Sequence, residues 1–147
     1  MGKTISTGFL TGVVVHGLAI QSAYPCNTTN YTNMSSREIK YIVMHYTGNT
    51  KDTAINNVKY YSTAANVNAS AHLFVDDSSI HQSVELRDKA WHCGTSGTYY
   101  HKECRNANSI GIEMCCTAGN YTPSETTITN SAYLCAYLCQ MIGVTAD

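Results

Sequence analysis

Residues 40–47 read KYIVMHYT, and this stretch decides the fold that we predict. It is rich in β-branched and aromatic side chains, and Gly48 and Asn49 end it. A short apolar run bounded by turn residues is typical of a buried central strand. His45 therefore lies at the carboxyl end of a strand, where open α/β sheets form their sites.

Helical and strand patterns alternate on the C-terminal side of this run. Apolar residues recur at helical spacing in two stretches, and Asp52 or Thr50 can cap the first of them. A turn at 76–78 joins two apolar runs into a hairpin, and Gly143 ends the last helix. The sequence therefore predicts an α/β class domain with one central mixed β-sheet flanked by helices. We expect strands at 40–47, 71–76, 79–86 and 109–115, and helices at 52–64 and 126–142.

The chain has 147 residues, which fits one domain. We divide it into an N-terminal extension and loop, residues 1–35, packed on a main domain of residues 36–147. Residues 8–20 read GFLTGVVVHGLAI, an apolar segment that two glycines and a histidine interrupt. We expect a strand or a packed arm there, and not a signal peptide. No apolar run reaches the ~18 residues that a membrane span needs.

The charge balance excludes one class of partner. Charged residues make up 13% of the chain, the formal net charge is −1, and no cluster of Lys and Arg occurs. Nucleic-acid binding therefore has no electrostatic support. Eleven Tyr residues against two Phe supply flat rings with a hydroxyl group, which suit carbohydrate contact but equally fill a polar surface.

The chain has seven cysteines, an odd number that cannot all pair within one molecule. No CxxC pair is present, so a structural zinc ribbon is not indicated. The pattern favours reduced, mostly buried thiols in a protein made in a reducing cytoplasm. Cys93 and Cys104 bracket a long loop and are the best candidates for a disulfide.

His45 and Glu113 occupy positions that suggest chemistry. A strand end holds an imidazole rigidly, which suits a metal ligand, although a structural histidine is the commoner case. Glu113 interrupts the apolar strand SIGIEMC. Burial raises the pKa of a carboxyl group, as a general base working near neutrality requires. The alternatives for Glu113 are a partly exposed side chain on an edge strand, or one paired with Arg105 or Lys102.

Trp91 and His92 precede a Gly-rich loop. They fit the wall of a sugar or peptide groove, and Trp91 equally fits an anchor for the loop. A cysteine hydrolase using Cys93 beside His92 is disfavoured, because sequence neighbours on a strand point apart and no orienting residue is evident.

Three ordered blocks resemble the type 2 N-acetylmuramoyl-L-alanine amidases: YIVMHYTGNT at 41–50, SAHLFVDDSSIHQSVELRDKAWHCG at 70–94 and NSIGIEM at 108–114. This family includes phage endolysins and bacterial wall hydrolases and is related to peptidoglycan recognition proteins. The resemblance covers about residues 36–142. It implies hydrolysis of the amide bond between N-acetylmuramic acid and L-alanine in peptidoglycan by zinc-activated water. It also implies a protein made in the cytoplasm of a Gram-positive bacterium that acts on the cell wall.

The resemblance also assigns roles to single residues. His45 matches the family's first zinc ligand, Glu113 matches its catalytic glutamate, and His72 matches a residue that holds the fold. Trp91 and His92 match the block that lines the substrate groove, and the end of the first strand is placed to hydrogen-bond glycan or peptide. The residues expected to contact substrate are Tyr46, Asn49, Trp91 and His92.

One part of the family pattern has no match. In the family, a second zinc-binding His and a third ligand, Asp or Cys, follow the last long helix, and no such segment lies before Asp147. We therefore expect a C-terminally incomplete domain without the family's last strand and without two of the three zinc ligands. His101 is the least implausible replacement. The alternative functions are a non-catalytic peptidoglycan-binding module and an inactive truncated fragment.

Overall fold

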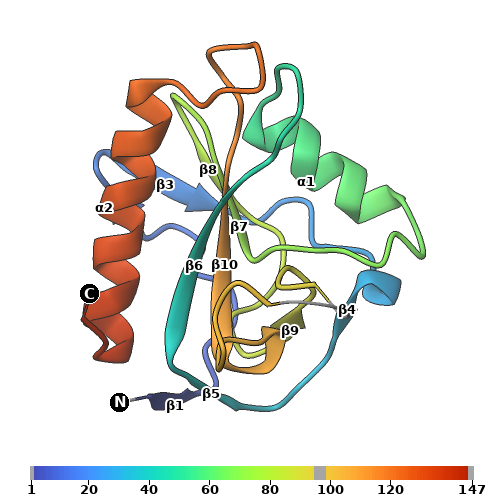
Figure 1. The fold of residues 1–147 in the computed structure, drawn as a ribbon, viewed down its shortest axis with the longest axis vertical. Coiled ribbons are helices and arrows are strands. Elements are labelled where there is room, and N and C mark those ends of the chain that lie inside the picture. The colour runs from blue at the N-terminus through green and yellow to red at the C-terminus, as the bar shows by residue number, and fades with distance from the viewer. Residues whose placement is uncertain (1, 95–98, 146–147) are drawn as a thin grey trace.

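The computed structural model describes residues 2–94 and 99–145. Its main feature is a mixed sheet with the strand order β2-β3-β8-β7-β10-β6 (Figure 1). Two small antiparallel pairs, β1 with β5 and β4 with β9, accompany it. The strands are β1 (Lys3–Ile5), β2 (Val14–Val15), β3 (Leu18–Gln21), β4 (Tyr31–Thr32), β5 (Arg37–Ile39), β6 (Tyr41–Tyr46), β7 (Leu73–Val75), β8 (Ile80–Gln82), β9 (Lys89–Ala90) and β10 (Ser109–Met114). The helices are α1 (Ala54–Thr63), α2 (Glu125–Ile142) and the short 3-10 helices η1 (Thr28–Asn30) and η2 (Asn106–Asn108).

Strand β10 lies between β7 and β6 and pairs in parallel with both. Strands β7 and β8 form an antiparallel hairpin, so the predicted mixed sheet and hairpin are confirmed. The prediction that residues 40–47 form the central strand is wrong, because within the described ranges β6 pairs along one edge only. An apolar run does not distinguish a central strand from an edge strand, and Met44 and Tyr46 of β6 are 37% and 58% exposed.

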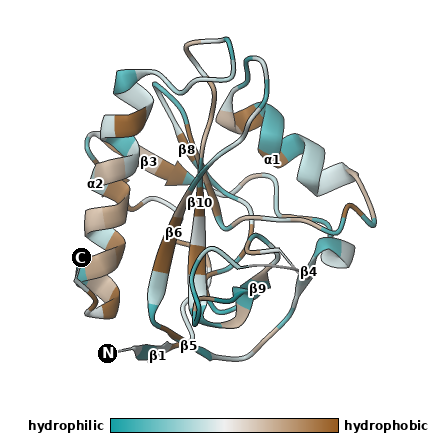
Figure 2. Cartoon of the chain, viewed as in Figure 1, coloured by the Kyte–Doolittle hydropathy of each residue, from teal (hydrophilic) through white to brown (hydrophobic). Residues whose placement is uncertain are grey.

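The two helices lie beside different faces of this sheet (Figure 1). Helix α2 contributes Leu134 and Leu138 to the main core, together with Ile110 and Ile112 of β10. Helix α1 packs against β7 and β8 and joins a smaller apolar cluster around Phe74. Figure 2 shows α1 mostly in hydrophilic colours, which fits its narrow contact with the sheet. Much of the polar surface of α1 therefore does not pack against the sheet.

Both helices begin at a side-chain cap. Helix α1 starts after Thr53, whose hydroxyl group accepts a backbone N–H of the first turn. The prediction that Asp52 or Thr50 caps α1 is therefore wrong. Helix α2 starts after Ser124 in the same way and ends as predicted at Gly143, which adopts a left-handed φ of 71°.

The first 35 residues supply strands that pack on the rest of the chain. Strands β2 and β3 form a hairpin, and β3 pairs in parallel with β8 of the main sheet. The strand expected within residues 8–20 is thus confirmed. Across residues 2–94 and 99–145, none of the helices has the length and apolar character needed to cross a membrane.

Candidate active site

Glu113 lies near the carboxyl end of β10, on the face opposite α2. Successive side chains of a strand point to opposite faces, so Ile110 and Ile112 enter the core under α2 while Gly111 and Glu113 face the other way. In the parallel register, Glu113 is the partner of His45 on β6. Because neighbouring strands are about 4.8 Å apart, the two residues lie side by side on one face.

The side chain of Glu113 is half-buried, and one of its carboxyl oxygens is shielded and unpaired. Its Oε2 atom is shielded from solvent and has no hydrogen-bond partner in the described part of the chain. Burial raises the pKa of Glu113, and the negative charge of Asp52 raises it further, to about 7. The side chain is partly exposed as the alternative had it, but β10 is no edge strand, because it pairs with β6 and β7. Among the described residues no ion pair joins Glu113 to Arg105 or Lys102, and the guanidinium group of Arg105 donates to backbone carbonyls of its own loop. Glu113 therefore has the proton affinity that a general base needs near neutral pH.

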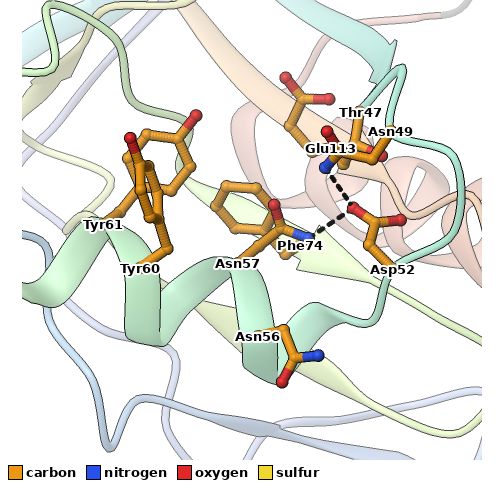
Figure 3. A pocket seen from close by; sticks show the side chains of 9 residues that line it. All are labelled: Thr47, Asn49, Asp52, Asn56, Asn57, Tyr60, Tyr61, Phe74 and Glu113. Carbon is orange, nitrogen blue, oxygen red and sulfur yellow. Dashed lines mark hydrogen bonds between the residues drawn. The ribbon is translucent and has the colours of Figure 1, made fainter. Parts of the chain in front are cut away.

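A cavity of about 410 Å³ opens beside Glu113 (Figure 3). Helix α1 forms much of the wall across from this carboxyl group and presents amide and phenol side chains. The loop between β6 and α1 completes the wall. The lining residues are Thr47, Asn49, Asp52, Asn56, Asn57, Tyr60, Tyr61, Phe74 and Glu113.

Asp52 links three segments of the cavity wall. Its Oδ2 atom accepts hydrogen bonds from Asn49 Nδ2 at 2.9 Å and from Asn57 Nδ2 at 2.7 Å (Figure 3). Its Oδ1 atom accepts from the backbone N–H of Cys116 at 2.5 Å. Hydrogen bonds to a carboxylate are the stronger kind. One side chain thus ties the β6–α1 loop and α1 to the segment that follows β10.

His45 and His92 form a hydrogen-bonded pair whose tautomers follow from their neighbours. The hydroxyl group of Ser109 donates to the carbonyl of Arg105 at 2.7 Å, so its oxygen accepts from His92 Nε2 at 3.1 Å. His92 Nδ1 then accepts from His45 Nε2 at 2.9 Å. Burial lowers the pKa of both rings, that of His92 to about 3, so both are neutral at pH 7. The unprotonated Nδ1 of His45 is therefore left to contact a ligand.

Gly111 gives His92 its position. A Cβ atom at residue 111 would lie 2.7 Å from Cγ of His92, so the ring rests directly on the backbone of β10. Behind it, His72 is fully buried and accepts from the backbone N–H of Gly111 at 3.0 Å. The other nitrogen of His72 contacts the carbonyl of Asp88 and the guanidinium group of Arg37. His72 thus holds the fold and lies behind the site.

Tyr46 and Asn49, the two residues near the end of β6 that we expected to contact substrate, lie in different places. Asn49 lines the cavity beside Glu113. Tyr46 is adjacent in sequence to His45 and so faces the other side of the sheet, where its register partner is Met114. The structure therefore brings Asn49 to the site and directs Tyr46 away from it.

Trp91 and His92 also have different surroundings. The indole N–H of Trp91 donates to Thr32 Oγ1 at 3.0 Å, and its backbone N–H donates to Ser70 Oγ. Trp91 is not among the described residues that line the cavity beside Glu113. His92 lines a second cavity of about 160 Å³ together with His45. Trp91 therefore anchors its loop to Thr32 and Ser70, and His92 lies next to His45.

Cys93 and Cys104 are free thiols, so the expected disulfide is not present. Cys93 Sγ lies 3.5 Å from His92 Nδ1, although we expected these neighbours to point apart. His92 is nevertheless a poor base, since burial and the neighbouring His45 bring its pKa to about 3. Burial and the adjacent Cys93 raise the pKa of the Cys104 thiol to about 11. Neither thiol therefore has an effective activating base, and a cysteine hydrolase gains no support.

The described side chains do not complete a zinc site. Residues 2–94 and 99–145 contain no group of three or more His, Cys, Asp or Glu side chains that could hold a metal ion. His101, the expected replacement ligand, lines the smaller cavity with His45. Its Nδ1 atom already accepts from the backbone N–H groups of Glu103 and Cys104. His45 is thus a single candidate ligand without a full set around it.

Sequence reasoning missed most of the cavity wall. Asp52 was interpreted as a helix cap, and the polar side chains of α1 were given no role. The spacing of these α1 residues in the sequence could have identified them. Asn57 and Tyr61 are four residues apart and share a helix face, as do Asn56 and Tyr60. An amide–phenol stripe next to a chemistry-bearing strand is the pattern that identifies such a wall.

Comparison with known proteins identifies the family of this chain. The family model described as N-acetylmuramoyl-L-alanine amidase matches residues 35–147. The mixed sheet and the two helices define a single α/β domain. The chain belongs to the N-acetylmuramoyl-L-alanine amidase family. The prediction from the three sequence blocks is confirmed.

Individual relatives show how much of them the chain covers. It is 32% identical over 116 residues to the N-acetylmuramoyl-L-alanine amidase CwlL of Bacillus licheniformis, which is 74% of this chain and 32% of that protein. It is 30% identical over 134 residues to BlyA of Bacillus subtilis strain 168, covering 84% and 36%. A mutant endolysin from Bacillus subtilis superposes with a TM-score of 0.71 at 26% identity, covering 87% of this chain and 79% of that one. The chain thus spans about a third of the length of these curated relatives.

Proposed function

We propose that this chain hydrolyses the amide bond between N-acetylmuramic acid and L-alanine in bacterial peptidoglycan. The observation that carries the proposal is the half-buried carboxyl group of Glu113, which has one shielded, unpaired oxygen and lies next to His45 beside a polar cavity. An unpaired buried carboxyl group costs folding free energy, which is expected at a functional site and not in a structural core. The amide and phenol groups of α1 give the cavity hydrogen-bonding partners for a glycan or peptide.

In this proposal Glu113 is the general base. Its carboxylate takes a proton from water as the water oxygen attacks the lactyl carbonyl carbon. When the carbon–nitrogen bond breaks, the same group returns the proton to the nitrogen of L-alanine, which leaves as a free amine. A pKa of about 7 suits both halves of this cycle, because the group gives and takes the proton with little cost near neutral pH.

Zinc dependence is a separate part of the proposal. His45 is the residue that we expect to contact the metal, through Nδ1, and a bound zinc would supply an activated water. Metal analysis of the purified chain tests this. One zinc per chain, lost on His45→Ala, would support zinc dependence; cleavage of peptidoglycan by a zinc-free chain in excess chelator would contradict it.

A non-catalytic peptidoglycan-binding module is the second candidate function. The observation that favours it is that the described residues hold no complete metal-ligand group. Such a module would bind purified cell walls and release nothing from them. Binding with no products would therefore favour the module over the amidase.

Product analysis tests the proposed reaction directly. Purified Gram-positive peptidoglycan is incubated with the chain, and new chain ends are measured. Amidase action creates free amino groups on L-alanine and no new reducing sugar ends. Reducing ends without new L-alanine termini would contradict the proposal and indicate glycan cleavage. The Bacillus relatives motivate the choice of a Gram-positive wall, and a phage origin is a further proposal that this assay does not address.

A further inference from the structure

The described lining of the cavity beside Glu113 contains acidic side chains and no positively charged side chain to balance them. Its described lining includes two carboxyl groups, those of Asp52 and Glu113, and no Lys, Arg or His. The charge of Asp52 reaches Glu113, whose pKa it raises. A ligand in this cavity therefore meets a negative potential, and an anionic group there would be repelled.

The nearest basic side chains of the same segments are directed elsewhere. Lys59 of α1 holds its ammonium group over the ring of Tyr24, 5.2 Å from the centroid. Lys51 precedes Asp52 in sequence, but its Cδ atom lies 3.8 Å from the position that a Cβ on Gly119 would take. Neither is among the residues that line the cavity.

The amide groups of the wall add to its acceptor character. Asn49 and Asn57 both direct their Nδ2 atoms to the carboxylate of Asp52, since only nitrogen can donate to it. Their carbonyl oxygens are left as the free ends of these amides. The part of the wall around Asp52 therefore presents hydrogen-bond acceptors, whereas Thr47, Asn56, Tyr60 and Tyr61 elsewhere in the lining carry groups that can also donate. The surroundings of Asp52 complement a ligand group with N–H donors, such as a carboxamide or an ammonium group.

We propose that this cavity selects peptide stems whose second residue carries a carboxamide in place of a free carboxylate, and that Asp52 sets this preference. The inference rests on the proposed function, because it places the peptide side of the scissile bond in the cavity. A carboxamide can donate two N–H groups to the acceptors around Asp52. A carboxylate in the same place offers only acceptors and brings a third negative charge close to Asp52 and Glu113.

Two ligands that differ only in this group test the inference. They are N-acetylmuramoyl-L-alanyl-D-isoglutamine, which carries the carboxamide, and N-acetylmuramoyl-L-alanyl-D-glutamate, which carries the acid. Binding to the Glu113→Gln chain is measured by titration calorimetry, because this variant prevents turnover during the titration. Cleavage by the unaltered chain is measured in parallel. We expect the carboxamide to be favoured by about ten-fold or more in cleavage efficiency and by a smaller factor in the variant, which has lost one carboxyl group.

Asp52→Asn keeps the size of the side chain and removes its charge. We expect it to reduce the preference in cleavage to about three-fold or less, mainly by improving use of the acid. Asp77→Asn is the matched control: Asp77 also accepts hydrogen bonds from several side chains, those of Thr117, Ser124 and Thr127, but lies outside the cavity. It removes the same charge from the protein and should leave the preference unchanged.

The outcomes separate the two proposals. Equal use of both ligands, or a preference for the acid, would overturn the inference while leaving the amidase proposal intact. Failure to bind or cleave either ligand, together with no L-alanine termini from whole peptidoglycan, would overturn the proposed function and the inference with it. If Asp52→Asn does not fold, the two ratios from the unaltered and Glu113→Gln chains still decide whether the cavity discriminates by charge.

Discussion

The two faces of β10 have opposite characters although they belong to one six-residue strand. On one face, Ile110 and Ile112 are fully buried under α2 in the main core. On the other, Gly111 and Glu113 lie beneath a histidine ring and beside a polar cavity. The first face contributes stability through apolar burial, and the second keeps an unpaired carboxyl group that lowers it. Alternation along a single strand thus places the proposed base on a rigid support.

The largest expected effect on stability is on the apolar face. Ile112→Ala leaves a cavity in the main core and should lower the free energy of unfolding by about 2–5 kcal/mol. Glu113→Gln, one position along the strand, removes a carboxyl group that lowers stability and should therefore not lower the free energy of unfolding. Urea unfolding of the two variants measures the contrast. Equal losses would show that the two faces do not differ as described.

The pH dependence of stability sharpens the comparison on the polar face. The pKa of Glu113 is about 7 in the folded chain, against an ordinary value of 4.5. The folded state therefore binds this proton more tightly than the unfolded state does. The contribution of Glu113 is most favourable below pH 4.5 and declines as pH rises to about 7, by up to about 3 kcal/mol.

This decline should be absent from Glu113→Gln. Thermal or urea unfolding of both chains from pH 4 to 8 gives the difference at each pH, so that all other titrating groups cancel. A difference that stays constant across this range would contradict the raised pKa. In the unaltered chain, activity should rise with pH around a midpoint near 7, as a base that must be deprotonated requires.

Gly111→Ala tests the contact between β10 and His92. The added methyl group would lie 2.7 Å from the ring, so the ring or the strand must move, at a cost of about 1–3 kcal/mol. The histidine signals of His92 and His45 in an NMR spectrum should shift together, because the two rings are hydrogen-bonded.

Gly143→Ala is the control for this substitution. It strains a left-handed residue at the end of α2, where an added Cβ meets no atom within 4 Å. It should lower stability without moving either histidine signal. Shifts of equal size in both variants would mean that the ring is not held by Gly111.

The smallest expected effect is at the helix caps. Ser124→Ala removes the hydrogen bond at the start of α2, which spans 3.1 Å, and should cost about 1 kcal/mol. Thr53→Ala at the start of α1 removes a longer one of 3.4 Å and should cost less. Denaturation midpoints of Ser124→Ala and Thr53→Ala show which substitution lowers stability more. A larger loss from Thr53→Ala would indicate that α1 depends on its cap more than its sparse packing suggests.

The sequence predicted the elements of the fold better than their order in the sheet. Periodicity located the strands around His45 and Glu113 and both long helices, because hydrophobic patterns report burial. Periodicity did not show that β6 lies at the edge of the sheet, because the apolar pattern of a strand does not reveal which distant strands pair with it. His45 and Glu113, which the sequence singles out, lie side by side in the structure, and their roles stay predictions. Asp52 was missed because its hydrogen bonds come from donors in three separate segments.

The role of Glu113 is tested most directly by release of L-alanine amino termini from purified peptidoglycan by Glu113→Gln. Glutamine keeps the shape of the side chain but cannot take a proton from water. The account predicts a loss of at least about a hundred-fold relative to the unaltered chain, with the fold retained by circular dichroism and unfolding. Unchanged release by a folded Glu113→Gln chain would contradict it.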